Sequence, residues 1–270
     1  MNANKDLWEK GDFTKIAAMM RNSGQTLVER IDKRLPMTAL DLGCGDGTTA
    51  VPLAKFGADV LGVDIARYLV EAGNRRAAAE GLGNLRFQEG DACHLEGLAD
   101  ASFDLTLSVF GAMFAPKPFD VAKEMVRVTK PGGQVVMGNW IPNDPTSFVS
   151  QVLKISSAFV PSPPEGFISP MTWGIESNIA ERFGKAGVPE KNISMVKDTF
   201  FFDGAMTIEQ YIDKFRNYYS PTMNAFAAAT KNGQEQELLM QLLALARSQN
   251  SSTDGTVRIG ATFLKVTVSV

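Results

Sequence analysis

The chain has 270 residues, 44% of them hydrophobic, with a formal net charge of −3 and a pI near 5.4. This length suits one large α/β domain, with or without an inserted cap. Proteins that bind nucleic acid backbones usually show a basic surplus or stripe, and none is visible, so we expect no nucleic acid partner. The first residues lack the apolar stretch that a signal peptide contains. No uncharged run reaches the roughly 18 apolar residues that a membrane-spanning helix needs. With only Cys44 and Cys93, we expect a cytoplasmic protein without disulfides and without a membrane span.

Residues 5–34 have apolar positions at helical spacing, among them Ile16, Met19, Met20 and Leu27, and Pro36 ends the run. A turn at residues 11–13 interrupts the pattern. Residues 1–36 therefore form a helical segment that either packs against the edge of the core or covers a ligand as a lid. In the second case Phe13 belongs to the binding site.

Residues 37–64 are typical of a strand, a glycine turn, a helix and a second strand. The first strand ends on Asp41, the turn covers residues 43–47, the helix begins near Thr48, and the second strand ends at Asp64. Glycines permit positive φ and a close approach of backbone to ligand, and the free N–H groups of a new helix favour polar or anionic ligands. An acidic residue at the end of the second strand can accept hydrogen bonds from ribose hydroxyls.

The spacing of the turn distinguishes two cofactor classes. A dinucleotide fingerprint requires G-x-G-x-x-G, but here the third glycine comes early, which disfavours an NAD-dependent oxidoreductase. The pattern Asp41-x-Gly43-x-Gly45-x-Gly47 resembles the glycine motif of class I S-adenosylmethionine-dependent methyltransferases. The resemblance implies S-adenosylmethionine as cofactor, with Asp41 near its methionine end. It also implies cofactor contacts from Gly43, Cys44, Gly45, Gly47, Asp64 and Ile65.

The next strand covers residues 85–90 and runs into Asp91 and Ala92. In the methyltransferase family an acidic residue here binds the adenine amino group, and the following backbone N–H meets a ring nitrogen. The alternative for Asp91 is a turn cap. A strand at 103–110, a helix at 119–129 and a strand at 134–139 continue the alternation, which predicts parallel βαβ units with the ligand at the carboxyl ends of the strands. Ser108 and Phe110 are expected at that edge, near the cofactor.

After residue 140 the simple alternation stops. Prolines frame a short helix near 147–159, a helix covers 173–183, and a strand covers 193–202. Two helical stretches, 207–219 and 222–249, precede a last strand at 257–270. The resemblance implies a Rossmann-like seven-stranded sheet of order 3-2-1-4-5-7-6, with the last strand antiparallel. We predict helices on both faces of this sheet and a helical cap. The predicted organisation is a lid (1–36), a cofactor core (37–140), an insertion (141–172), further core (173–203), the cap (204–250) and the final strand (251–270).

Within the family, residues 110–116 and 139–142 resemble the small-molecule branch typified by ubiquinone- and menaquinone-biosynthesis methyltransferases. This predicts an acceptor pocket after the fourth strand and beneath the cap. Aromatic and sulfur side chains at this edge can wall a pocket or fill a core, and both interpretations stay open. The candidate pocket residues are Met113, Trp140, Trp173, Tyr211, Phe215 and Tyr218.

Several motifs of other methyltransferase classes are absent from the sequence, which disfavours those classes of reaction. Residues 108–111 lack the Asn/Asp-Pro-Pro-aromatic pattern of amino-group methylases, no cysteine lies near the fourth or fifth strand, and the single histidine, His94, offers no ligand cluster, so we expect no metal. The predicted function is methyl transfer from S-adenosylmethionine to a small, hydrophobic acceptor by direct in-line displacement. The alternative is a non-catalytic protein that binds S-adenosylmethionine or S-adenosylhomocysteine. The sequence identifies no catalytic base and no oligomeric state.

Overall fold

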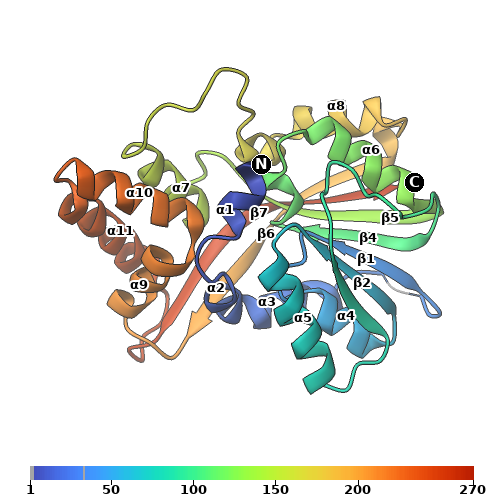
Figure 1. Cartoon of the computed structure of the whole chain (residues 1–270), viewed down its shortest axis with the longest axis horizontal. Helices are drawn as coiled ribbons and strands as arrows, with labels where there is room; N and C mark the ends of the chain where they lie inside the picture. Colours follow the sequence, from blue (N-terminus) through green and yellow to red (C-terminus); the bar gives the residue numbers. More distant parts are fainter. Residues whose placement is uncertain (1–2, 33) are drawn as a thin grey trace.

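The computed structural model describes residues 3–32 and 34–270. Its centre is one seven-stranded sheet of order β3-β2-β1-β4-β5-β7-β6, in which β7 runs antiparallel to both of its neighbours and the other pairs are parallel. Figure 1 shows the sheet with helices on both faces. This confirms the predicted fold class and strand order. The strands are β1 (Thr38–Leu42), β2 (Asp59–Asp64), β3 (Leu85–Glu89), β4 (Phe103–Val109), β5 (Thr129–Trp140), β6 (Ile193–Gly204) and β7 (Val257–Ser269).

Helices cover the sheet because its central strands are apolar on both sides, as parallel strands must be when both faces are buried. Every residue of β1 after Thr38 is buried, and so is every residue of β2 after Asp59. In Figure 1, α3 (Arg21–Glu29), α4 (Ala50–Phe56) and α5 (Arg67–Ala79) lie below the sheet, whereas α6 (Pro118–Val128) and α8 (Glu176–Lys185) lie above it. This leaves the carboxyl ends of β1, β2 and β4 free to form a binding site.

A helical cap stands beside the sheet, at the left of Figure 1. Its members are α7 (Phe148–Ser157), α9 (Ile208–Tyr218), α10 (Ser220–Lys231) and α11 (Glu235–Gln249). The ring of Phe148 lies 5.5 Å from that of Tyr211 and 5.6 Å from that of Phe215. The helix of the predicted insertion therefore packs with the helices of the predicted cap in one body.

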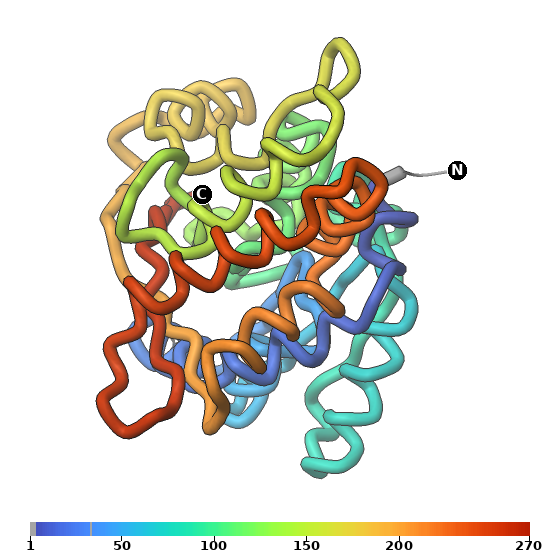
Figure 2. The backbone as a smooth tube through the Cα atoms, turned by 90° about the vertical axis from the view of Figure 1, so that its left-hand side faces the viewer, coloured from blue at the N-terminus to red at the C-terminus, as the bar shows by residue number. Residues whose placement is uncertain are grey.

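The N-terminal segment is not one continuous helix. It forms α1 (Ala3–Trp8), α2 (Thr14–Ala17), the 3₁₀ turn η1 (Ala18–Met20) and then α3. The break occurs at Gly11, which has φ = +81°, and at Asp12, whose Oδ1 accepts hydrogen bonds from the backbone N and Oγ1 of Thr14. Figure 2 shows this blue segment running alongside the orange helices α9 and α10, so it lies between the cap and the sheet.

Within the described ranges, no helix is both long enough and apolar enough to cross a membrane.

Candidate active site

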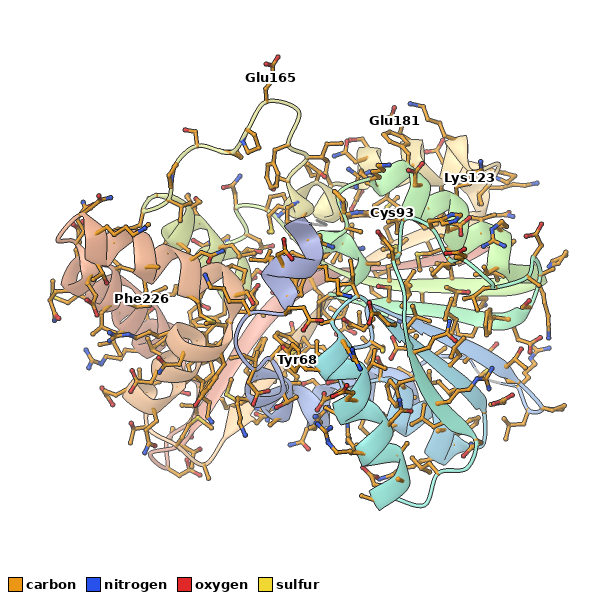
Figure 3. The ribbon with its side chains drawn as sticks, in the orientation of Figure 1. Tyr68, Cys93, Lys123, Glu165, Glu181 and Phe226 are labelled. Atoms are coloured by element: carbon orange, nitrogen blue, oxygen red, sulfur yellow. The ribbon has the colours of Figure 1, made fainter. Side chains whose placement is uncertain are left out.

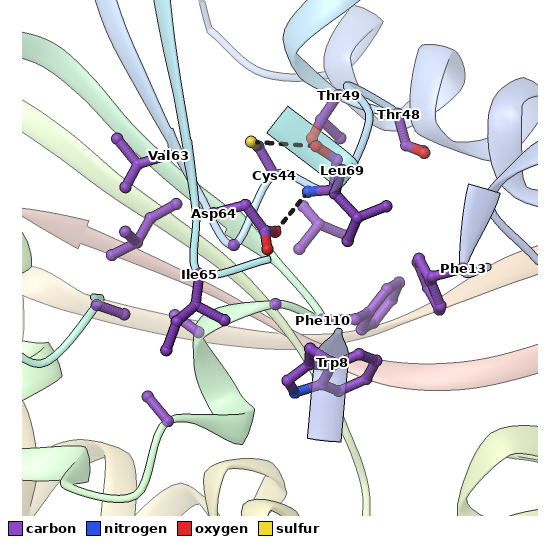
Figure 4. Close-up of a pocket in the computed structure, with 18 of the residues that line it drawn as sticks. Trp8, Phe13, Cys44, Thr48, Thr49, Val63, Asp64, Ile65, Leu69 and Phe110 are labelled. Atoms are coloured by element: carbon purple, nitrogen blue, oxygen red, sulfur yellow. Dashed lines mark hydrogen bonds between the residues drawn. The ribbon is translucent and has the colours of Figure 1, made fainter. Parts of the chain in front are cut away.

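A pocket opens at the carboxyl ends of β1, β2 and β4, and the N-terminal segment covers it. About 900 Å³ of space lies within the pocket and its mouth, a volume that includes the solvent in front of the opening. In Figure 4, Asp64, Cys44 and Thr49 lie on one side, and Trp8, Phe13 and Phe110 gather on the other. The site is therefore built from two unlike walls.

The glycine turn after β1 makes the first wall. The backbone N–H groups of Gly43 and Cys44 donate to the carbonyl of Val63, at 2.8 and 3.2 Å, which ties the turn to β2. Gly43 has φ = +67°, and a Cβ atom there would lie 2.7 Å from backbone atoms of Gly111. Only glycine tolerates both conditions, so the turn can cross directly beneath the loop that follows β4.

Asp64 is held in a fixed orientation at the end of β2. Its Oδ2 accepts a hydrogen bond from the Gly45 backbone N at 2.8 Å, and its Oδ1 accepts one from the Ala66 backbone N at 2.9 Å. The side chain lines the pocket although the residue is only 8% exposed, and this burial raises its pKa to about 6. A desolvated carboxylate with unused lone pairs is well suited to accept hydrogen bonds from ligand hydroxyls.

Three of the predicted cofactor residues lie behind the pocket wall. Asp41 is 1% exposed; its Oδ2 accepts a 2.6 Å hydrogen bond from Thr49 Oγ1, and burial raises its pKa to about 7. A Cβ atom at Gly47 would lie 2.8 Å from the ring of Phe87. Ser108 donates to the Leu42 carbonyl and accepts from the Ala112 backbone N. These residues shape the turn and the β4 loop and do not line the pocket, and their contacts with the cofactor stay a prediction.

The remaining predicted cofactor residues lie around one pocket, and their contacts with the cofactor stay a prediction. Gly43, Cys44, Gly45, Asp64, Ile65, Asp91, Ala92, Phe110 and Phe13 all line the pocket. Asp91 also caps its turn, because its Oδ1 accepts a 2.8 Å hydrogen bond from the Cys93 backbone N. The two interpretations of Asp91 are therefore compatible.

Phe110 joins the two walls. It has φ = +61°, an uncommon conformation for an aromatic residue, and its N–H donates to the Gly138 carbonyl at 2.9 Å. Its ring stacks on Trp140 with the centroids 3.5 Å apart, and the ring of Phe200 meets it edge-on at 5.0 Å. These contacts fix one side of the apolar wall.

The predicted acceptor residues are not brought into the pocket. Met113, Trp140, Trp173, Tyr211 and Phe215 are each at most 2% exposed and belong to the core, and half-buried Tyr218 also lies outside the lining. For Tyr211 and Phe215 the physical reason is that the cap helices bury their aromatic stripes against one another, together with Phe148. Trp140 stacks on Phe110, and Trp173 packs against Phe183. A role of these residues in acceptor binding stays a prediction.

The apolar wall comes from elsewhere in the chain: Trp8, Ala17 and Met20 of the N-terminal segment and Phe200 of β6 line the pocket. Sequence reasoning missed them, along with Thr48 and Thr49. The apolar spacing of Ile16, Met19 and Met20 did indicate a buried helix face, but it did not identify which residues would face a ligand.

Comparison with known proteins identifies the family. A family model described as a methyltransferase domain matches residues 40–137. An uncharacterized protein of Mycobacterium tuberculosis is 31% identical over 245 residues, covering 90% of this chain and 86% of the relative. The chain belongs to the class I S-adenosylmethionine-dependent methyltransferases. A demethylmenaquinone methyltransferase of Paenarthrobacter aurescens is 30% identical over 172 residues, 60% of this chain and 66% of that protein.

The YcgJ protein from Bacillus subtilis shares the fold of this methyltransferase, with a TM-score of 0.58, 18% identity and coverage of 91% of this chain and 97% of that one. The methyltransferase takes S-adenosylmethionine as its cofactor. The pocket fits that group, because it joins a turn free of side-chain bulk to a buried, preoriented carboxylate. Over residues 3–32 and 34–270, no three His, Cys, Asp or Glu side chains group so as to hold a metal ion, and the expectation of no metal stays a prediction.

Proposed function

We propose that this methyltransferase acts on a small, mainly apolar acceptor by direct in-line displacement, within the pocket between the glycine turn and the N-terminal segment. The observation that carries the proposal is the composition of the second wall. Ala17, Met20, Phe110 and Phe200 line it, and none of these side chains carries a charge. A macromolecular acceptor would favour an open polar groove, whereas an enclosed apolar wall suits a small hydrophobic molecule.

The polar wall has the groups that the cofactor needs. We assign the ribose hydroxyls to Asp64 beside Ile65, the adenine to Asp91 and Ala92, and the methionine end to the backbone of residues 43–45. All of these residues line the pocket. The two backbone N–H groups that hold the Asp64 carboxylate leave it further lone pairs for ligand hydroxyls.

A phenolic or enolic acceptor gives up a proton as it accepts the methyl group, and that proton passes to a side chain or to water. When bound, the cofactor supplies a methyl group that its sulfonium already activates. The remaining task of the side chains is orientation, which can contribute about 7–11 kcal/mol of barrier reduction in favourable cases. The Phe110 ring, fixed between Trp140 and Phe200, is a rigid surface against which an acceptor can be aligned.

The N-terminal segment serves as the lid of the pocket. Its Phe13 N–H donates to the Tyr68 hydroxyl at 2.9 Å, and its Glu9 Oε1 accepts from the Arg67 backbone N at 2.7 Å, so it is tied to α5. Figure 3 shows Tyr68 on α5 directed toward this segment. The Trp8 ring lies 5.0 Å from that of Phe114 and 6.4 Å from that of Tyr219, which joins the lid to the β4 loop and to the cap. A lid of this kind excludes water from the reacting atoms.

A planar aromatic acceptor in its electron-rich form, such as a phenol or a hydroquinone, fits this wall best, because the methyl group must be attacked by a nucleophile. Aromatic rings favour edge-to-face and stacked contacts, and Trp8, Phe13, Phe110 and Phe200 offer such faces around the pocket. The relative named demethylmenaquinone methyltransferase supports the same class of acceptor.

The test is incubation of the protein with methyl-labelled S-adenosylmethionine and a metabolite extract, followed by mass spectrometry. We expect label in a small apolar compound. Asp64→Ala serves as the control that removes the proposed cofactor contact. Label in the protein or nucleic acid fraction, with none in small molecules, would contradict the assignment of the acceptor.

A further inference from the structure

The N-terminal segment contacts the glycine turn on the side that faces away from the pocket. Arg21, the first residue of α3, forms an ion pair through Nη2 with Oδ2 of Asp46 and donates from Nη1 to Thr48 Oγ1 at 3.0 Å. The side chain of Asp46 is only 7% exposed, so this pair is largely removed from water. Charge-assisted hydrogen bonds from a forked guanidinium fix geometry as well as adding energy.

A second contact of the same helix is steric. Gly24 lies one turn after Arg21, and a Cβ atom there would stand 2.6 Å from both Cγ2 and the carbonyl oxygen of Thr48. Helix α3 therefore rests directly on the backbone of the turn, and Thr48 itself lines the pocket.

Arg76 of α5 holds the turn from another side. Its Nη1 donates to the Gly47 carbonyl at 2.9 Å and to the Asp46 carbonyl at 3.3 Å. The two arginines belong to different parts of the chain. Arg76 is in the cofactor core. Arg21 is in the N-terminal segment, directly after Met20, which lines the apolar wall together with Ala17. The same short segment thus contacts both the acceptor side of the pocket and the cofactor turn.

We propose that Arg21 is a positioning residue that couples the shape of the cofactor turn to the docking of the N-terminal segment, so that cofactor affinity depends on the lid. The inference rests on the proposed function, in which the cofactor lies against residues 43–45. With Arg76 alone, no polar contact would join the turn to the lid, and only the contact between Gly24 and Thr48 would remain. With Arg21, any displacement of residues 14–20 also releases Asp46 and Thr48.

The experiment measures S-adenosylhomocysteine binding by titration calorimetry, and amide hydrogen exchange of residues 43–49 in the free protein. We expect Arg21→Ala to weaken binding about tenfold, inside the range of indirect coupling effects. We also expect faster exchange in the turn. Arg21→Lys keeps the charge but loses the fork, so it should show an intermediate effect and serves if the alanine variant folds poorly.

Arg30→Ala is the matched control, because Arg30 follows α3 and pairs with Asp198 at 3.5 Å, away from the turn. It should leave both binding and turn exchange unchanged. Asp46→Asn should weaken binding like Arg21→Ala, and the double variant should be little worse than either single one. Unchanged turn exchange and affinity in Arg21→Ala and Arg21→Lys, or additive losses in the double variant, would overturn the coupling.

The same measurements separate this inference from the cofactor assignment. If Asp64→Ala binds S-adenosylhomocysteine as tightly as the unmodified protein, the proposed cofactor site fails. Hydrogen exchange of residues 43–49 in the free protein still decides whether Arg21 holds the turn, since that readout needs no ligand.

Discussion

The two walls of the pocket are held together by different forces. The cofactor wall is made of backbone and small side chains, and its shape depends on hydrogen bonds such as those from Gly43 and Gly45 to the end of β2. The acceptor wall is made of large apolar side chains from the N-terminal segment, the β4 loop and β6, and ring contacts around Phe110 hold it.

This contrast has a consequence for how each wall tolerates change. Hydrogen bonds are directional and weaken steeply when their angle changes. A close approach between two backbone segments leaves no room for an added side-chain atom. Apolar packing is roughly proportional to area and tolerates replacement by residues of similar volume. Substitutions should therefore disable the cofactor wall and only retune the acceptor wall.

The largest effect is expected at Gly43. Alanine there requires a positive φ, which costs about 1–2 kcal/mol, and its Cβ would overlap Gly111 backbone that cannot easily move, which adds about 1–3 kcal/mol. We expect Gly43→Ala to lower the free energy of unfolding by the sum of these, measured in urea. Gly45→Ala is the matched control, because its Cβ would meet no atom within 4 Å and should add only the backbone cost. Equal losses in the two variants would refute the close-approach argument.

A smaller effect is expected from Asp64→Ala. Loss of a charged hydrogen-bond acceptor costs about 1.5–3 kcal/mol, or roughly ten- to hundredfold in S-adenosylhomocysteine affinity, measured by calorimetry. Asp59→Ala, at the exposed start of the same strand, should leave affinity unchanged. A folded Asp64→Ala variant with normal affinity would rule out the ribose assignment.

Asp41 gives a pH-dependent prediction. Burial raises the pKa of Asp41 to about 7, so the folded protein keeps a proton on this carboxyl group that the unfolded chain releases above about pH 4. The free energy of unfolding therefore decreases as the pH rises from 4 to 7. Asp41→Asn should match the unmodified protein near pH 4 and exceed its free energy of unfolding at pH 8. We expect a gain of about 1–2 kcal/mol, since relaxation and water entry offset part of the desolvation.

Asp104 tests the sign of that argument. Burial opposes its ionisation, but hydrogen bonds from Thr38 and Lys130 outweigh burial and lower its pKa. The ionised Asp104 carboxylate therefore stabilises the folded protein at neutral pH, and this stabilisation is lost when the carboxylate is protonated in acid. Asp104→Asn should therefore destabilise at pH 8 and have less effect as the pH falls. If both variants change stability in the same direction at pH 8, the electrostatic interpretation of Asp41 is wrong.

The same contrast explains what the sequence could predict. Gly43, Gly45 and Asp64 are identified by spacing, because a backbone turn imposes fixed residue types at fixed positions. The parallel βαβ units follow from the alternation of strands and helices, whereas the strand order follows from the resemblance to the methyltransferase family. Tyr211 and Phe200 have no such marker: both are buried aromatic residues in amphipathic elements, and only tertiary packing decides that Phe200 faces the pocket while Tyr211 packs within the cap. Asp41 occupies a motif position and Ser108 lies near the end of β4, yet neither residue lines the pocket.

The smallest effect on cofactor affinity is expected at Phe200, where the acceptor wall can be altered alone. Phe200→Leu shortens a side chain that lines the pocket and meets Phe110 edge-on, so it should change the profile of labelled products from the metabolite extract. A hydrophobic pocket discriminates by about 1–3 kcal/mol per methylene, which is enough to favour bulkier acceptors over the original one. S-adenosylhomocysteine affinity should change by less than about threefold, because the polar contacts are untouched.

Phe202→Leu is the matched control: Phe202 is equally buried on the same strand, and its ring packs against Phe215 at 6.1 Å outside the pocket lining. Both variants should lose similar stability, and only Phe200→Leu should alter the products. A change of products in Phe202→Leu of the same size would mean that the cap, rather than the wall formed by Phe110 and Phe200, selects the acceptor.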